Sequence, residues 1–295
     1  MVSSFLNKRI SSGLAAGLFG LIIIVLGGWW FTVALGVIVH LALLEFFRMA
    51  EFTGIRPATK TTLVACQILL ITTQLSLDSV VSNELSAAVL PLSGAAICGW
   101  LLLQPITGSI SDIAASIFGL FYLGFLPSHW LKLRNFSEVG VINSSHLTWQ
   151  FNYEEINYGM LITLSACLMI VAFDIGSYLI GRRFGSSPLS PISPGKTIEG
   201  AIGGFLCAIL IGCISAQVLK LDLSIFVGCF LGFIVSIFAL VGDLTESMMK
   251  RNAGIKDSGN ALPGHGGILD RIDSYLFTPA VVYYIIIFII PFLTS

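Results

Sequence analysis

Residues 223–242 read LSIFVGCFLGFIVSIFALVG, a run of twenty positions without a charged side chain. A helix of about 20 residues is long enough to cross the hydrocarbon core of a bilayer. The run is uninterrupted, so it does not fit the alternating pattern of a membrane β-barrel strand. The stretch therefore predicts a membrane-spanning α-helix, in which every backbone polar group is satisfied internally.

Comparable stretches recur along the whole chain. Hydrophobic residues make up 56% of the 295 positions and charged residues only 11%, against about 25% charged in soluble domains. A soluble globular protein and a disordered chain are therefore excluded, and the net charge of -1 removes the basic excess of a nucleic-acid binder. We predict an all-α polytopic integral membrane protein. Its nine candidate spans are 12–28, 29–47, 61–77, 86–103, 107–127, 156–180, 198–219, 223–242 and 275–293.

The positive charges indicate an orientation. With nine spans and a cytoplasmic N-terminus, twelve Lys and Arg residues fall inside and three outside, namely Lys132, Arg134 and Lys220. The most polar segments of the chain then face the cytoplasm. Because the chain is short and shows no transit peptide, we expect a bacterial cytoplasmic (inner) membrane. Spans one and two are joined so tightly that a hairpin that does not cross stays open. No small-residue cleavage site follows the first apolar run, which favours an uncleaved helix over a signal peptide.

We expect two regions, 1–155 with about five spans and an extracytoplasmic loop, and 156–295 with about four spans and the polar motifs. The loop, about 128–155, holds His129, His146, Glu154 and Glu155, whose scattered spacing favours a solvated loop over a metal site. The six cysteines lie in apolar stretches without CxxC spacing, which favours packing over zinc ligation.

Charge is concentrated in residues 242–273, GDLTESMMKRNAGIKDSGNALPGHGGILDRID, which hold nine of the 31 charged residues. Asp243, Glu246 and Lys250 are spaced to share one helix face, and Asp270 and Asp273 are three apart. Two acidic helix ends joined by a loop can converge on a divalent cation that also contacts phosphates. The alternative is a solvated interfacial cap with internal ion pairs.

The loop in this segment is rich in glycine. Gly264, Gly266 and Gly267 surround His265 and permit backbone amides to approach an anion closely. His265 is either a second phosphate donor or a surface histidine. Cations that suit phosphate recognition lie on both sides of the loop. They are Lys250, Arg251, Lys256 and Arg271.

A second polar cluster, FDIGSYLIGRRFGSSPLSPISPGKTIEG, covers residues 173–200. Its GKT at 195–197 is not a P-loop, because Ser190 stands where that motif needs glycine and we expect a polar turn instead of a strand before it. Together the two clusters hold seven positive and seven acidic side chains. A nucleoside triphosphate and a lipid phosphate would bring roughly five to six negative charges, so added cations are required.

These residues resemble the CDP-diacylglycerol synthase family, also called phosphatidate cytidylyltransferase. The upstream cluster is similar to the family's D-x-G-A-Y, G-R-x-F-G and S-P-x-K-T-x-E-G patterns, with Ser177 in place of alanine and Gly195 where many members have a basic residue. The first 170 residues match only in being apolar. The C-terminal signature is reproduced at Ser247, Lys250, Arg251, Lys256, Asp257, Gly259, Leu262, Pro263, His265, Gly266, Gly267, Asp270, Arg271 and Asp273.

The resemblance implies conversion of CTP and phosphatidate to CDP-diacylglycerol and diphosphate, with a divalent metal, usually Mg²⁺, and a homodimer. The family's metal-binding carboxylates map onto Asp243 and Asp270, and Asp273 would orient waters or a second cation. The attacking group is already a phosphate, so positioning and charge stabilisation matter more than a strong base. The predicted catalytic set is Asp243, Lys250, Arg251, Lys256, Asp257, His265, Asp270, Arg271 and Asp273. The predicted nucleotide-binding set is Ser193, Lys196, Thr197, Glu199 and Asp174.

Other readings stay open. A CTP-dependent lipid kinase or an ether-lipid cytidylyltransferase would use similar chemistry, although the complete C-terminal signature argues against the kinase. A secondary transporter would need its ion site near the midplane, whereas these charges cluster on one face. Glu45 and Asp112 lie near membrane boundaries and either cap helices or line a lipid entrance.

Overall fold

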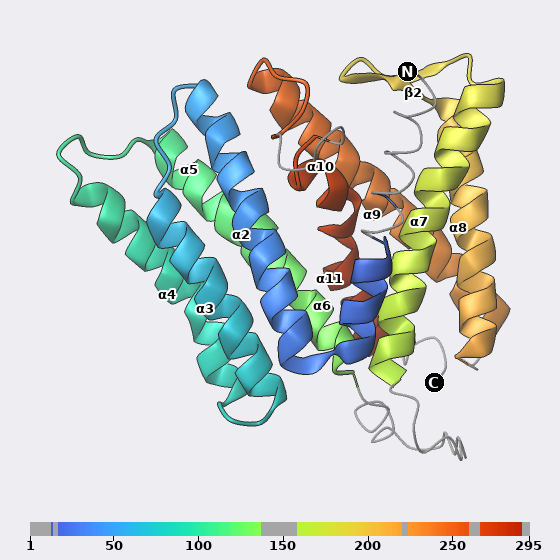
Figure 1. The fold of residues 1–295 in the computed structure, drawn as a ribbon, viewed down its shortest axis with the longest axis horizontal. Coiled ribbons are helices and arrows are strands. Elements are labelled where there is room, and N and C mark those ends of the chain that lie inside the picture. Colours follow the sequence, from blue (N-terminus) through green and yellow to red (C-terminus); the bar gives the residue numbers. More distant parts are fainter. Residues whose placement is uncertain (1–12, 14–16, 137–157, 220–223, 260–265, 291–295) are drawn as a thin grey trace. The chain divides into compact units, whose positions relative to one another are not determined.

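The computed structural model describes residues 13, 17–136, 158–219, 224–259 and 266–290. In this part of the chain the structure is almost entirely helical, with one short β-hairpin (Figure 1). The helices are α2 (Gly28–Phe52), α3 (Thr59–Leu77), α4 (Asn83–Leu102), α5 (Ile110–Gly119), α6 (Leu126–Arg134), α7 (Tyr158–Phe184), α8 (Ile198–Val218), α9 (Ser224–Asn252), α10 (Leu269–Ile272) and α11 (Thr278–Tyr284). Short π-helices continue α5 over Leu120–Phe125 and α11 over Ile285–Ile289, and a 3₁₀ turn follows α10 at Asp273–Tyr275.

Eight helical segments of the described chain are long and apolar enough to cross a membrane, which confirms an all-α, multi-pass membrane protein. They match the second to ninth predicted spans. From the predicted first span, the structure describes a shorter apolar helix, Gly17–Leu26. Large apolar side chains such as Leu206 and Leu210 on α8 are exposed, as expected for surfaces whose solvent is lipid.

The fifth span is longer than the sequence predicts. It runs over Ile110–Arg134, so His129, Lys132 and Arg134 belong to a helix and not to the extracytoplasmic loop. The prediction was wrong there because these polar residues alternate with Trp130, Leu131 and Leu133, which are buried. His129 is itself fully buried, with Nδ1 3.0 Å from the carbonyl oxygen of Phe125. The other predicted loop residues, His146, Glu154 and Glu155, lie outside the described residues.

The chain divides into two compact units by spatial contact. Unit 1 consists of Met1–Leu131 and Met248–Asp273, and unit 2 consists of Lys132–Ser247 and Ser274–Ser295. Helix α9 is continuous through the division and contributes its last residues to unit 1. Most of the C-terminal signature segment, Met248–Asp273, is thus grouped with the N-terminal helices, whereas Asp243 and Ser247 belong to unit 2.

Unit 1 packs α2 against α3, α5 and the π-helix that follows α5. Leu43 and Phe47 of α2 are buried in its core, where a Cβ on Gly119 would approach the Phe47 ring and a Leu43 methyl group to 3.0–3.1 Å. Cys66 is buried against Gly124, which fits the predicted packing role of the cysteines. Asp112 forms a capping box with Ser109 at the start of α5, which confirms helix capping for this acid.

Unit 2 packs α7 along α8, and glycines bring the two helices close together. A Cβ on Gly204 would overlap the Ser177 hydroxyl and lie 2.7 Å from the carbonyl oxygen of Phe173. Between these helices the chain forms an antiparallel hairpin of β1 (Pro188–Ser190) and β2 (Ser193–Thr197). The sequence predicted only a polar turn here. Strand β2 ends at Thr197, directly before the first residue of α8, so the start of α8 sets the position of the strand.

Candidate active site

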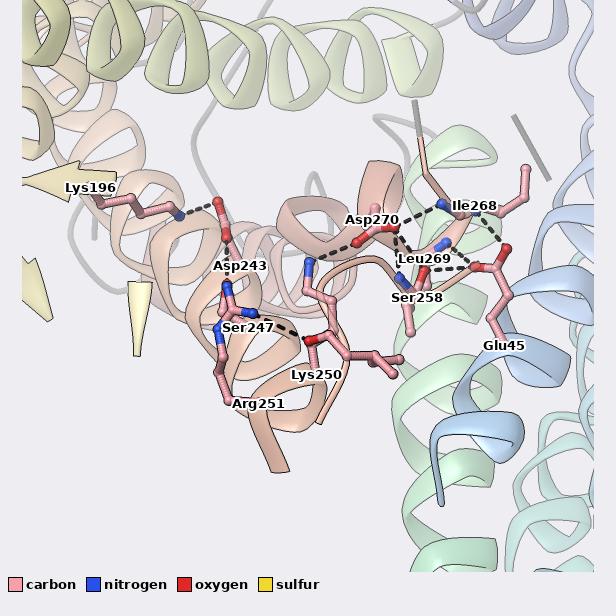
Figure 2. A network of polar contacts seen from close by, with 12 residues as sticks. Glu45, Lys196, Asp243, Ser247, Lys250, Arg251, Ser258, Ile268, Leu269 and Asp270 are labelled. Carbon is pink, nitrogen blue, oxygen red and sulfur yellow. Dashed lines mark hydrogen bonds and ion pairs between the residues drawn. The ribbon is translucent and has the colours of Figure 1, made fainter. Parts of the chain in front are cut away.

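Residues of the two predicted motifs form two clusters of polar side chains (Figure 2). The first, called the Lys196 cluster, lies in unit 2 and comprises Lys196, Asp243, Ser247 and Asp174. Lys196 on β2 forms an ion pair with Asp243 on α9. Each of these two side chains keeps 27% of its surface exposed, so the pair is open to exchange with a ligand.

The neighbours of this ion pair add further oxygen atoms. Ser247, one helical turn after Asp243, donates its hydroxyl to Asp243 Oδ1 over 3.4 Å. Asp174 of α7 interacts electrostatically with both Asp243 and Lys196. The structure thus brings together three residues that the sequence assigned to different motifs, Asp174, Lys196 and Asp243.

The β-hairpin is braced by two of the predicted nucleotide-binding residues. Thr197 caps α8, because its hydroxyl oxygen accepts the Gly200 amide at 3.1 Å. The carboxylate of Glu199 accepts the Ser186 hydroxyl at 2.8 Å and the amides of Ser186 and Ser187 at 3.2 and 3.3 Å. Both side chains therefore have structural partners that position Lys196, and Ser193 lies on the same strand.

The second cluster, called the Asp270 cluster, lies in unit 1 and comprises Lys250, Asp270, Ser258, Gly267 and Glu45. Lys250, in the last turn of α9, pairs with Asp270 Oδ1 at 2.7 Å. Asp270 Oδ2 accepts the Ser258 amide at 2.9 Å, the Ser258 hydroxyl at 3.0 Å and the Gly267 amide at 2.7 Å. Both oxygens of this carboxylate are thus engaged, one by Lys250 and the other by Ser258 and Gly267.

Glu45 of α2 also belongs to this cluster, a role that the amino-acid sequence did not indicate. Its carboxylate accepts the amides of Ile268 and Leu269 at 3.0 and 2.8 Å, and the Ser258 hydroxyl at 3.0 Å (Figure 2). Capping was one of the two roles expected for Glu45, but the capped element is α10, more than 220 residues further along the chain. An acid inside an apolar helix was the only local signal.

The other predicted catalytic residues differ in how exposed they are. Arg251 is exposed and donates to the carbonyl oxygen of Ile255 at 3.2 Å, and Lys256, Asp257 and Arg271 are exposed as well. Asp273 is buried at the start of the 3₁₀ turn. His265 lies outside the described residues, so its role stays a prediction.

The predicted metal ligands fit magnesium in kind, since Mg²⁺ prefers carboxylate oxygens. Asp243 and Asp270 belong to different units, and each lies beside a lysine. Among the residues described, no group of three or more His, Cys, Asp or Glu side chains is arranged to hold a metal ion.

Comparison with known proteins identifies the family. The model of the cytidylyltransferase family matches residues 7–289. This chain belongs to the cytidylyltransferase family. A phosphatidate cytidylyltransferase of Synechocystis sp. is 42% identical, covering 98% of this chain and 99% of the relative. A chloroplastic phosphatidate cytidylyltransferase of Arabidopsis thaliana is 36% identical, covering 95% of this chain and 73% of the relative. A phosphatidate cytidylyltransferase of Bacillus subtilis is 28% identical, covering 95% of this chain and 97% of the relative.

The match to the cytidylyltransferase family extends well beyond the two motifs. Residues 7–289 include α2 and therefore Glu45, in the half of the chain that resembled the family only in being apolar. Both polar clusters thus lie inside the matched region. In each cluster a lysine pairs with an aspartate: Lys196 of β2 with Asp243, and Lys250 in the last turn of α9 with Asp270.

Proposed function

We propose that this cytidylyltransferase uses CTP and phosphatidate to make CDP-diacylglycerol and diphosphate, a step of phospholipid biosynthesis. The observation that carries the proposal is the pairing of Lys196 with Asp243 and of Lys250 with Asp270. In each pair, a lysine ammonium group that can bind a phosphate lies beside a carboxylate that can bind a divalent cation. Near-full-length similarity to proteins named phosphatidate cytidylyltransferase supports the choice of substrates.

In the proposed reaction an oxygen of the phosphatidate phosphate attacks the α-phosphorus of CTP. The bond from that phosphorus to the oxygen bridging to the β-phosphate breaks, and diphosphate leaves with the electron pair. Because the second pKa of a phosphate monoester is about 6, the nucleophile is already largely ionised at neutral pH. The protein therefore needs to position two anionic groups and offset their charge.

Lysine and arginine side chains supply that charge. Lys196 and Lys250 would contact CTP phosphates, with Arg251, Lys256 and Arg271 neutralising the triphosphate and the departing diphosphate. Helix α9 carries residues of both clusters, since Asp243 and Lys250 are seven positions apart on it.

Magnesium would be held by Asp243 and Asp270, and would supply positive charge against the phosphate oxygens. Asp273 would orient waters or a second cation. We further propose a cytoplasmic-facing active site in a bacterial inner membrane, reached by the lipid from the bilayer, and a homodimer. The excess of Lys and Arg on one side of the predicted topology supports this orientation.

The deciding experiment follows cytidine-labelled CTP with purified protein in detergent and Mg²⁺, with and without phosphatidate. Label that enters the organic phase only with phosphatidate supports the proposal. Consumption of CTP without cytidine in lipid contradicts it and favours a kinase. An ether-lipid acceptor, offered in competition, tests whether the acceptor is the ester lipid.

A further inference from the structure

Three described residues of the C-terminal signature segment, Ser258, Ile268 and Leu269, are bonded to an acid from a distant helix. Glu45 lies near the end of α2 in unit 1, and three donors converge on its carboxylate. The Ile268 amide bonds to Oε1, while the Leu269 amide and the Ser258 hydroxyl bond to Oε2. All three distances lie between 2.8 and 3.0 Å, which is the usual range for well-formed hydrogen bonds.

The donors belong to the two ends of one loop. Ser258 lies at its beginning and is buried, whereas Ile268 and Leu269 lead into α10 at its end. A single carboxylate on α2 therefore links Ser258 to Ile268 and Leu269, and accepts backbone amides that the first turn of α10 leaves without helical partners. Hydrogen bonds to an ionised carboxylate are stronger than those between neutral groups.

Glu45 and Asp270 share one hydroxyl group. Ser258 Oγ lies 3.0 Å from Glu45 Oε2 and 3.0 Å from Asp270 Oδ2. A serine hydroxyl has one proton to donate, so it bonds to one carboxylate at a time. The Ser258 amide and the Gly267 amide keep Asp270 in place in either case. Moving Glu45 would thus alter the surroundings of the carboxylate that pairs with Lys250.

Two glycines, Gly259 and Gly267, lie so close to Glu45 that a side chain at either position would collide with its carboxylate. A Cβ on Gly259 would lie 2.5 Å from Glu45 Oε1, and a Cβ on Gly267 would overlap Oε2. Gly266 has a φ of +80°, a conformation that other residues rarely adopt. The chain therefore passes close to the carboxylate on both sides, and the close approach depends on residues without side chains.

We propose that Glu45 is a positioning residue for cytidylyl transfer, which holds Ser258 together with Ile268 and Leu269 so that Asp270 and Lys250 are presented to the nucleotide. The inference rests on the proposed function. Glu45 contacts neither nucleotide nor lipid in this role, and acts through the loop. The apolar N-terminal helices thereby contribute a specific polar contact to the reaction, besides the membrane environment.

The test compares Glu45→Leu and Glu45→Gln with the matched control Asp112→Asn. Asp112 is also a carboxylate of unit 1 that accepts an amide from a separate segment, Arg56, at 2.6 Å, besides the Ser109 amide at the start of its own helix at 2.7 Å. In the contacts described it bonds to no residue of the C-terminal signature segment. Glu45→Gln keeps one carbonyl oxygen for the Ile268 amide, so it should fold even if Glu45→Leu does not.

Two measurements are made on each protein in detergent. Hydrogen–deuterium exchange of a peptide covering 266–272 reports directly on the Ile268 and Leu269 amides. Steady-state kinetics separate kcat from the KM for phosphatidate. For Glu45→Leu we expect exchange in this peptide to rise about tenfold and kcat to fall about 10- to 100-fold, with little change in the KM for phosphatidate. Glu45→Gln should lie between wild type and Glu45→Leu, and Asp112→Asn should change neither quantity.

Three results would overturn the proposal. The first is hydrogen–deuterium exchange in the Glu45 variants that equals that of the wild type. The second is raised exchange in these variants while their kcat stays at the wild-type value. The third is a loss of kcat in Asp112→Asn as large as that in the Glu45 variants. If the wild-type protein transfers no cytidine to phosphatidate, the proposed function fails, and the exchange data still decide whether Glu45 anchors the loop.

Discussion

Lys250 and Asp270 form an ion pair with 2.7 Å between Nζ and Oδ1, although 20 residues separate them in the chain. The two side chains are 13% and 10% exposed, so the pair is mostly removed from water. In such surroundings a charge without its partner is costly, and each side chain therefore depends on the other. The pair fixes the end of α9 relative to α10 within unit 1.

Replacing Asp270 by asparagine should abolish most of the activity. The substitution Asp270→Asn would remove the charge that faces Lys250 and place an amide donor among the donors of Ser258 and Gly267. We expect kcat to fall at least about 100-fold, as when a charge-stabilising group is removed from an active site. Cytidine transfer to phosphatidate measures the loss, with the exposed Glu84→Gln as control. Activity within a few-fold of wild type would remove Asp270 from the proposed site.

Replacing Lys196 by methionine should weaken the use of CTP. Methionine keeps an apolar chain of similar length but lacks the ammonium group that pairs with Asp243. If Lys196 contacts a phosphate of the nucleotide, kcat/KM for CTP should fall about 10- to 100-fold, because a charge-assisted contact is lost. The exposed Lys60→Met provides the control. An unchanged kcat/KM for CTP would make Lys196 a structural partner of Asp243 only.

Close packing of α7 on α8 gives a prediction about stability. In Gly204→Ala the new methyl group would overlap the Ser177 hydroxyl and press on the Phe173 carbonyl. Overpacking of this kind costs about 1–3 kcal/mol, so the thermal unfolding midpoint in detergent should fall. Gly99→Ala is the control, since a Cβ at Gly99 meets nothing within 4 Å and alanine favours helix. Equal midpoints for the two variants would contradict the tight α7–α8 contact.

Most of the fold follows from the sequence because membrane helices are specified locally. In a bilayer the backbone N–H and C=O groups of an apolar run must form their hydrogen bonds within the run, so a run such as 223–242 predicts a helix without knowledge of its neighbours. Boundaries are less certain where polar residues are interleaved with buried ones. That is why α6, with buried His129 beside Trp130, extends into what the sequence indicated as a loop.

The candidate site could be predicted only in part. The C-terminal signature identified Lys250 and Asp270, which the structure pairs. Lys196 was predicted from the upstream pattern and Asp243 from the family's metal-binding carboxylates, and the structure pairs these as well. Glu45 could not be connected to them, because its partners Ile268 and Leu269 are 223 and 224 residues away. A single sequence carries no record of which distant segments touch, so an acid in an apolar helix indicates a role but not its partner.

Removal of divalent cations gives the last prediction. If Asp243 and Asp270 hold magnesium, EDTA should stop cytidine transfer and added Mg²⁺ should restore it. Asp243→Asn should then need about tenfold more Mg²⁺ for half-maximal activity, because a neutral amide is a weaker ligand for a hard cation than a carboxylate. Glu51→Gln, which changes an exposed acid at the end of α2, should leave the Mg²⁺ dependence unchanged. A magnesium titration of Asp243→Asn that overlays the wild-type curve would show that Asp243 serves Lys196 instead of a metal.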